Sequence, residues 1–320
     1  HGVGSGGRAF YGMAGGSFQG EQVTIHDAAN LHNDGVTVSL RNSLLVGIDT
    51  VQSYTGDHNV QLADDTDVFI TAGAGAHYLP PDTPYRAAGA TNVTADLLAD
   101  LQDRTTDPPV EWTQAITEDT VWRPMAARGF EVPTLGYHYP AADYLVNQLP
   151  VSAATLRVEG GAVVLVAGSK GWKLQAGARL DSEGYPDDLN RVVRSGMVQE
   201  QHAPTLAGGT AGVLIAEDLT QGTVPEVWLR FTELSVPANG GYHFNGGARL
   251  GVLALLDCQL AGALLNLSQN GSQTWRVGLT NSLFERVYMC LGSGTDSTLT
   301  VHGRNNLFRG CTLKLHPTAA

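Results

Sequence analysis

The chain has 320 residues, of which 42% are hydrophobic and 16% charged, and its formal net charge is -12. This composition supports a packed core, and 39 glycines with little charge are typical of a β-rich fold with many turns. It excludes nucleic acid as a partner, because the three lysines (Lys170, Lys173 and Lys314) and the scattered arginines form no basic face. It also excludes membrane insertion, since no apolar run reaches roughly 18–20 residues.

The chain opens at His1, so we expect a processed form or an excised piece. Residues 36–40 alternate in polarity and residues 68–71 form a second apolar run, as β-strands do. Between them the phrase Asn-Ser-Leu occupies residues 42–44, and the same phrase returns at 281–283. We predict that residues 1–92 form a first β-helix segment.

Residues 93–134 are predicted to be a connection that contains a helix and is rich in proline. Thr94 can cap a helix over residues 94–105, and Leu97, Leu98 and Leu101 give it an apolar stripe. Residues 106–134 are expected to be irregular because they carry four prolines: Pro108, Pro109, Pro124 and Pro133.

Residues 135–320 are predicted to be a second β-helix segment. Apolar, strand-like runs occupy residues 154–158, 162–166, 172–174, 227–231 and 250–256. Residues 181–188, with Gly184 and Pro186, are expected to be an exposed loop.

A repeat of 24 residues dominates the last third of the chain. Residues 256–267, 280–291 and 304–315 align without a gap. Three apolar core columns follow: Leu260, Phe284 and Phe308; Leu265, Met289 and Leu313; Leu267, Leu291 and Leu315. Asp257, Asn281 and Asn305 form a polar column, which predicts a ladder of side chains at a left-handed turn.

Such a unit cannot bury its own apolar face, so copies must stack as parallel strands. The sequence therefore predicts an all-β parallel β-helix, a solenoid of 24-residue coils. The last coil runs to Leu315 without a polar cap. Two explanations fit: the chain belongs to a longer protein, or its open end stacks on another copy.

Three cysteines, Cys258, Cys290 and Cys311, leave at least one without a disulfide partner in the chain. Their spacing fits no zinc motif, and Cys311 shares a column with Ala263 and Val287. We interpret them as small residues of the strand columns; their redox state is left open.

Three phrases carry a resemblance to a protein family. They are residues 83–89 (Thr-Pro-Tyr-Arg-Ala-Ala-Gly), residues 133–139 (Pro-Thr-Leu-Gly-Tyr-His-Tyr) and the repeated Asn-x-Leu-Phe. Together they resemble right-handed β-helix regions of large secreted bacterial surface proteins, some of which carry YD (Rhs-type) repeats. The resemblance implies right-handed winding and an extracellular or cell-surface location. It carries over no catalytic residue, since Arg86 or Ala87 and Thr134 stand where acids are common in that group.

Asp64, Asp65 and Asp67 form the densest acidic cluster. Paired carboxylates can divide acid and base roles, but adjacent residues of a strand point to opposite faces. A turn with a solvated or Ca²⁺-binding edge is therefore favoured over catalysis. A copper site at His1 is the less favoured alternative for the first residue.

His26, His32, His138 and His243 do not cluster in sequence, and we expect hydrogen-bonded side chains rather than ligands. Ser43 and Ser282 lie in turns without a nucleophile motif. Several aromatic residues could form a strip for sugar stacking, although packing in the core or at an interface is favoured: Tyr137, Tyr139, Tyr144, Tyr242 and Trp228.

We favour a non-catalytic extracellular structural or adhesive module that self-assembles end to end. One alternative is a polysaccharide lyase or glycoside hydrolase acting on an acidic polysaccharide, and another is a carbohydrate-binding module. No cofactor is expected. The partners would be another copy, the rest of a longer chain, or a polysaccharide.

Overall fold

The computed structural model describes residues 7–129, 132–199, 212–217, 222–236, 241–244, 250–269, 274–293 and 298–316. Within these ranges the only helices are α1 (Ala95–Gln102) and α2 (Ser195–Val198), and neither is long and apolar enough to span a bilayer. The strands stack as parallel coils with about 24 residues per turn, which confirms the predicted parallel β-solenoid. Right-handed winding stays a prediction of the resemblance.

The chain divides into two compact units. The first contains residues 1–108 and 126–141, and the second contains residues 109–125 and 142–320. Residues 109–125, which the sequence analysis assigns to the connection at 93–134, are thus part of the second unit.

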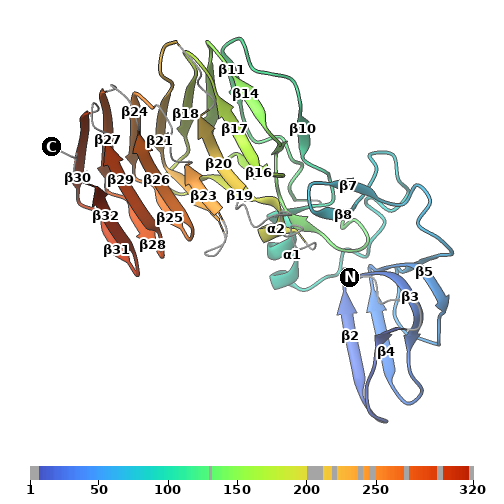
Figure 1. Ribbon diagram of the computed structural model, residues 1–320. Helices are drawn as coiled ribbons and strands as arrows, with labels where there is room; N and C mark the ends of the chain where they lie inside the picture. The colour runs from blue at the N-terminus through green and yellow to red at the C-terminus, as the bar shows by residue number, and fades with distance from the viewer. Residues whose placement is uncertain are drawn as a thin grey trace. The chain divides into compact units, whose positions relative to one another are not determined.

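The second unit consists of three parallel sheets that successive strands visit in turn (Figure 1). Among the described residues, one sheet has eight strands: β10 (Val110–Trp112), β13 (Tyr144–Val146), β16 (Val163–Val166), β19 (Asn190–Arg194), β22 (Thr232–Ser235), β25 (Gln259–Ala261), β28 (Leu283–Glu285) and β31 (Leu307–Arg309). Another has seven described strands: β14 (Leu149–Val151), β17 (Lys170–Leu174), β20 (Gly212–Glu217), β23 (Gly241–Phe244), β26 (Leu264–Gln269), β29 (Tyr288–Ser293) and β32 (Thr312–His316).

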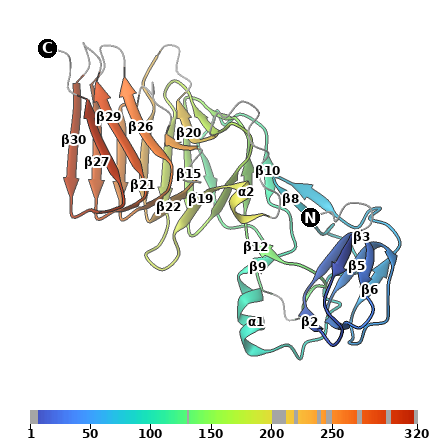
Figure 2. The ribbon, with the colours of Figure 1, turned by 60° about the horizontal axis from the view of Figure 1, so that its bottom comes forward.

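The remaining sheet of this unit also has seven described strands and is called the β11–β30 sheet below. Its members are β11 (Thr120–Trp122), β15 (Thr155–Glu159), β18 (Arg179–Glu183), β21 (Glu226–Arg230), β24 (Val252–Leu256), β27 (Thr274–Thr280) and β30 (Thr298–Arg304). Figure 2 shows β15, β21, β27 and β30 of this sheet from a second direction.

The 24-residue period sets the register of the last turns, because equivalent residues of successive copies pair. Leu260 pairs with Phe284 and Phe284 with Phe308, and the two phenylalanine rings stack with centroids 4.8 Å apart. The other two columns pair in the same way: Leu265 with Met289 and Leu313, and Leu267 with Leu291 and Leu315. Each buried member contributes about 1.5–3 kcal/mol to folding.

The last member of each core column is exposed, in contrast to the earlier members. Phe308 is 43% exposed, Leu313 53% and Leu315 62%, whereas Leu291 is 1% exposed. Among the described residues no strand covers this coil on its far side, so these side chains lack the neighbour that buries the others.

A left-handed turn recurs at the same point of each of these coils. Asp257, Asn281 and Asn305 have φ angles of 55°, 50° and 52°, and the Asn305 amide donates to Asn281 Oδ1 at 2.8 Å. The neighbouring serine adds a second ladder: Ser282 Oγ accepts from the Cys258 N–H at 3.2 Å, and the Ser282 N–H donates to Asn306 Oδ1 at 2.9 Å. These bonds satisfy backbone groups that the bend removes from the sheets.

The first unit is also built from parallel coils, with shorter offsets. One sheet contains β1 (Arg8–Phe10), β3 (Thr24–His32), β5 (Leu44–Thr50) and β6 (Val60–Leu62), and a second contains β2 (Ser17–Glu21) and β4 (Thr37–Arg41). Two antiparallel pairs complete it: β7 (Ile70–Ala72) with β8 (Gly75–Tyr78), and β9 (Arg104–Thr105) with β12 (Tyr139–Pro140).

Helix α1 begins after Thr94, whose side chain accepts a hydrogen bond from the Leu97 N–H at 3.3 Å. This agrees with the predicted cap. The helix ends at Gln102, three residues earlier than predicted, and buries Leu101.

Two expectations were wrong. Residues 106–134 are not irregular throughout, because β10 and β11 lie there and pair in parallel with β13 and β15. The flanking prolines leave these strands only three residues each, too short for a sequence pattern. Residues 181–188 are not entirely a loop, because Asp181 to Glu183 belong to β18 and pair with β21.

Candidate functional site

The outer face of the β11–β30 sheet changes character along the stack. In register, one outward row contains Arg157, Asp181, Trp228, Ala254, Gly278 and His302. Val227 and Leu229, on either side of Trp228, are buried, as the alternation of a strand requires. The row thus passes from charged side chains on β15 and β18 to small ones on β24 and β27.

Arginines and acids alternate over β15, β18 and β21. The ion pairs are Arg157–Asp181 at 3.9 Å, Arg179–Asp181 at 3.0 Å, Arg179–Glu226 at 3.9 Å, Arg230–Glu183 at 3.3 Å and Arg230–Asp257 at 3.7 Å. At such exposure each is worth at most about 1 kcal/mol of stability. Their effect is to hold the side chains around Trp228 in place.

Trp228 stands on this face with 37% of its surface exposed. Its indole Nε1–H donates to Glu226 Oε2 at 2.9 Å, and the Arg179 guanidinium carbon lies 5.2 Å from the ring centroid. Arg179 belongs to β18, on one side of β21. The hydrogen bond and the cation–π contact together orient the ring.

A groove of about 350 Å³ lies on the outer face of this sheet. Its lining includes Trp228, Arg230, Ala254, Gly278 and Thr280. The groove is open because its floor is small: a Cβ placed on Gly278 would meet no atom within 4 Å. An aromatic wall beside a floor of small residues can accept a flat ligand with an apolar face.

Two of the five aromatic residues considered for a sugar-stacking strip pack in the core, as the favoured interpretation expects. Tyr139 is 0% exposed and stacks on Tyr78, and Tyr144 is 2% exposed and stacks on Trp122 at 4.4 Å. Both tyrosines belong to the core. Of the other three, Tyr137 lies in the first unit and Tyr242 in the sheet of β23, so Trp228 alone remains on this face.

Sequence reasoning missed the groove, although a signal existed. Ala254 and Gly278 are outward residues one repeat apart and are both small, whereas the inward columns beside them carry leucine and valine. A column of small residues on the solvent side of a strand marks a hollow in the surface.

The acidic cluster at residues 64–67 is a turn. A hydrogen bond from the Thr66 side chain, followed by the bond that the Thr66 N–H donates to Asp64 Oδ1 at 3.0 Å, lowers the pKa of Asp64. The Val68 N–H donates to the Asp65 carbonyl at 3.1 Å. The carboxylates do not converge, because Asp65 faces His26 Nε2 at 3.4 Å instead.

Two histidines of the first unit contact each other. His26 Nδ1 lies 3.0 Å from His77 Nε2, so only one of these nitrogens can carry a proton in the bond. Burial, followed by the charge of His77, lowers the pKa of His26. His32 contacts the backbone carbonyls of Asn33 and Ser53 at 2.9 and 3.0 Å. None of these histidines belongs to a group of side chains that could bind a metal ion among the described residues.

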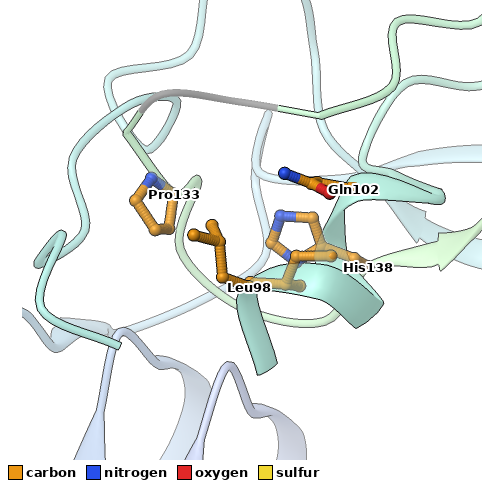
Figure 3. A pocket seen from close by; sticks show the side chains of 5 residues that line it. Leu98, Gln102, Pro133 and His138 are labelled. Carbon is orange, nitrogen blue, oxygen red and sulfur yellow. The ribbon is translucent and has the colours of Figure 1, made fainter. Parts of the chain in front are cut away.

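His138 borders a small apolar pocket in the first unit. Figure 3 shows its ring beside Leu98 and Gln102 of α1, with Pro133 also lining the pocket. The pocket measures about 10 Å³, space for about one water molecule, so it cannot hold an organic ligand. Burial lowers the pKa of His138 to about 4.

His243 is fully buried in the second unit. Its Nε2 bonds with the Gly262 carbonyl at 2.9 Å, and its Nδ1 has no partner within the described part of the chain. Burial lowers the pKa of His243 to about 4. The neutral imidazole of His243 therefore stabilises the fold through its hydrogen bond to this carbonyl.

The cysteines are free thiols. Cys258 is buried, and burial raises the pKa of its thiol to about 12, so it is unreactive. Cys311 Sγ contacts the Phe284 carbonyl at 3.1 Å.

Arg86 and Thr134, which stand where acids are common in the similar β-helix regions, make contacts within the first unit. The Arg86 guanidinium donates to the carbonyls of Pro80 and Leu79 and pairs with Asp107 at 2.6 Å. Thr134 Oγ1 accepts from the Ala87 N–H at 3.4 Å. The contacts shown at these positions are therefore structural ones within the first unit.

Among the described residues, no group of three or more His, Cys, Asp or Glu side chains is placed to hold a metal. His1 lies outside the described residues. Comparison with family models, curated proteins and solved structures found no match to this chain. The groove beside Trp228 is thus the candidate site on geometric grounds alone.

Proposed function

We propose that the chain is a non-catalytic extracellular adhesive module that binds carbohydrate in the groove beside Trp228. The observation that carries the proposal is the oriented, exposed indole beside the floor of Ala254 and Gly278. The axial C–H groups of a pyranose ring form an apolar face that stacks on an indole, while its hydroxyls need polar partners at the edge.

The groove supplies both kinds of contact. Trp228 offers the flat surface, and Arg230, Thr280 and Glu183 supply donors and acceptors from the lining. The stack of coils also suits a polymer, because strands repeat about every 4.8 Å along it, a step close to the length of one sugar residue.

Binding without cleavage fits the carboxylates at hand. Asp181 and Glu183 line the groove, but Arg179 and Arg230 already pair with them at 3.0 and 3.3 Å. A lyase or hydrolase needs an acid and a base free to exchange protons with the substrate. Incubation with a bound polysaccharide should therefore leave its chain length unchanged.

The test is a screen against immobilised polysaccharides followed by titration calorimetry. Trp228→Ala should weaken binding about tenfold or more, because the stacking surface is lost. Tyr288→Ala is the matched control, since Tyr288 is 38% exposed, much as Trp228 is, but lies on β29 in another sheet. Equal losses in both variants, or no binding to any polysaccharide by the wild type, would sink the proposal.

We propose as a second function that another coil packs on the edge formed by β30, β31 and β32, and that a second copy can supply it. Leu307, Phe308, Leu313 and Leu315 are 43–62% exposed there. The exposed strand edge adds unpaired backbone groups to this apolar surface.

The experiment is the size-exclusion mass with electron microscopy of the particles. End-to-end stacks are expected, and Leu313→Lys with Leu315→Lys should abolish them, while Tyr288→Lys on a side face should not. A wild type that stays monomeric at high concentration would contradict self-assembly.

A further inference from the structure

Two arginines lie on the same sheet face as the groove, next to its lining residues. Arg276 lies on β27, two residues from Gly278, and Arg304 lies on β30 beside Thr280. Both are exposed, and the alternation of the strands turns them outward with Gly278 and Thr280. Each side chain is long enough to reach the rim of the groove.

These two arginines differ from the others on the same face. Arg157, Arg179 and Arg230 all have an acid within 4.0 Å. Among the described residues neither Arg276 nor Arg304 forms an ion pair, and β24, β27 and β30 contain no acidic residue. The strands beyond Trp228 therefore carry two arginines without an acidic partner, next to a part of the groove whose own lining is uncharged.

The composition of this region points the same way. From residue 250 to residue 320 the chain has five basic residues and three acidic ones, although its overall net charge is -12, and two of these basic residues, Arg276 and Arg304, lie on the groove's sheet. A local excess of cations in an acidic protein is suited to an anionic ligand.

We infer that the ligand is an acidic polysaccharide, a polymer containing uronic acid, whose carboxylates meet Arg276 and Arg304 while one sugar ring stacks on Trp228. This inference rests on the proposed carbohydrate binding at the same groove. Arginine suits the role because its planar guanidinium pairs with a carboxylate through two hydrogen bonds. Arg276 and Arg304 lie on adjacent strands but four residues apart in register, a separation of roughly 14 Å, so they would meet two separate carboxylates of the polymer.

The test compares each acidic polymer with its neutral ester, which keeps the backbone and removes the charge. The probes are polygalacturonate with its methyl ester, and alginate with its propylene glycol ester. At low salt the acid forms should bind about fivefold or more tighter than the esters, and the difference should shrink as salt is added. Arg276→Gln and Arg304→Gln should each weaken binding of the acid about three- to tenfold and leave binding of the ester unchanged.

Arg309→Gln provides the matched control, because Arg309 is an exposed arginine on β31 in another sheet and its replacement changes the net charge equally. An unchanged circular dichroism spectrum and urea midpoint would show that the variants fold. If acid and ester bind alike and only Trp228→Ala weakens them, the acidic preference is overturned and carbohydrate binding stands. If Arg309→Gln weakens binding of the acid as much as Arg276→Gln does, the effect comes from the net charge of the protein, and the groove does not recognise the carboxylates. If neither polymer of either pair binds, both proposals fail.

Discussion

The two units contain the same Asn-Ser-Leu turn, and they build the same ladder with it. In the first unit Ser43 Oγ accepts from the Val23 N–H at 3.3 Å, and the Ser43 N–H donates to Asn59 Oδ1 at 3.0 Å. In the second unit Ser282 makes the equivalent bonds to Cys258 and Asn306. The Asn-Ser-Leu sequence therefore specifies the same turn in coils of different length.

The asparagines of the two turns have different surroundings. Asn42 is 0% exposed, and its side chain bonds both the N–H and the carbonyl of Ala90 at 2.7 and 3.3 Å. Residues 83–90 and 133–137 cover this turn and bond each other, for example from the Gly89 N–H to the Pro133 carbonyl at 2.8 Å. Asn281 is exposed and bonds the next coil, through the Asn305 amide at its side chain and the Arg304 carbonyl at its N–H.

The difference teaches that a turn motif sets its own backbone but not its burial. Both asparagines adopt left-handed φ angles, 52° at Asn42 and 50° at Asn281. What covers them depends on segments distant in sequence. The two phrases that suggested a family resemblance prove to be the cover of the first turn.

The largest expected effect comes from removing the covered asparagine. Asn42→Ala leaves the buried Ala90 N–H and carbonyl without partners and forces alanine into a left-handed conformation, so about 3–4 kcal/mol of stability should be lost. Asn281→Ala, the matched control, should cost about 1 kcal/mol because water can replace its bond. Hydrogen exchange should show the first loss in residues 36–62.

All five tryptophans lie in the second unit, so their fluorescence reports its unfolding and should hardly respond to Asn42→Ala. Equal exchange in the two variants would mean that the cover contributes nothing and that the turns are equivalent.

Acid should destabilise both units through their buried histidines. The folded pKa of His243 is about 4, below the ordinary 6.5, so its contribution is complete above pH 6.5 and is lost as the pH falls toward 4. At pH 5 the loss is about 2 kcal/mol for the second unit. His138, also at about 4, should act in the same direction on the first unit.

His243→Phe provides the control, because it removes the titrating group and should flatten the pH dependence of the fluorescence-detected urea midpoint between pH 7 and 5. If the urea midpoint of this variant still falls between pH 7 and 5, other titrating groups cause the acid sensitivity.

The sequence predicted the coils best where copies follow without a gap. The columns of Leu260 and Leu265 were visible because three units in succession keep the 24-residue spacing. The position of Trp228 in the row of Ala254 and Gly278 was not visible, because Trp228 pairs with Ala254, whereas a 24-residue offset would place it against Val252. A two-residue change of loop length keeps a side chain outward but moves it to another row, and no local pattern shows this.

The smallest expected effect tests whether the shared serine ladder is equivalent in the two units. Ser43→Ala and Ser282→Ala each remove one acceptor of a backbone N–H and one donor to a carbonyl, Arg41 in the first unit and Thr280 in the second. Each should cost about 1 kcal/mol, since both serines are almost fully buried, at 0% and 2% exposed. Exchange of the Val23 and Cys258 amides would report the two losses separately. Similar increases in both rates would show that the turn carries its own stability wherever it lies, whereas a much larger increase at Val23 would show that the cover over the first turn depends on the ladder beneath it.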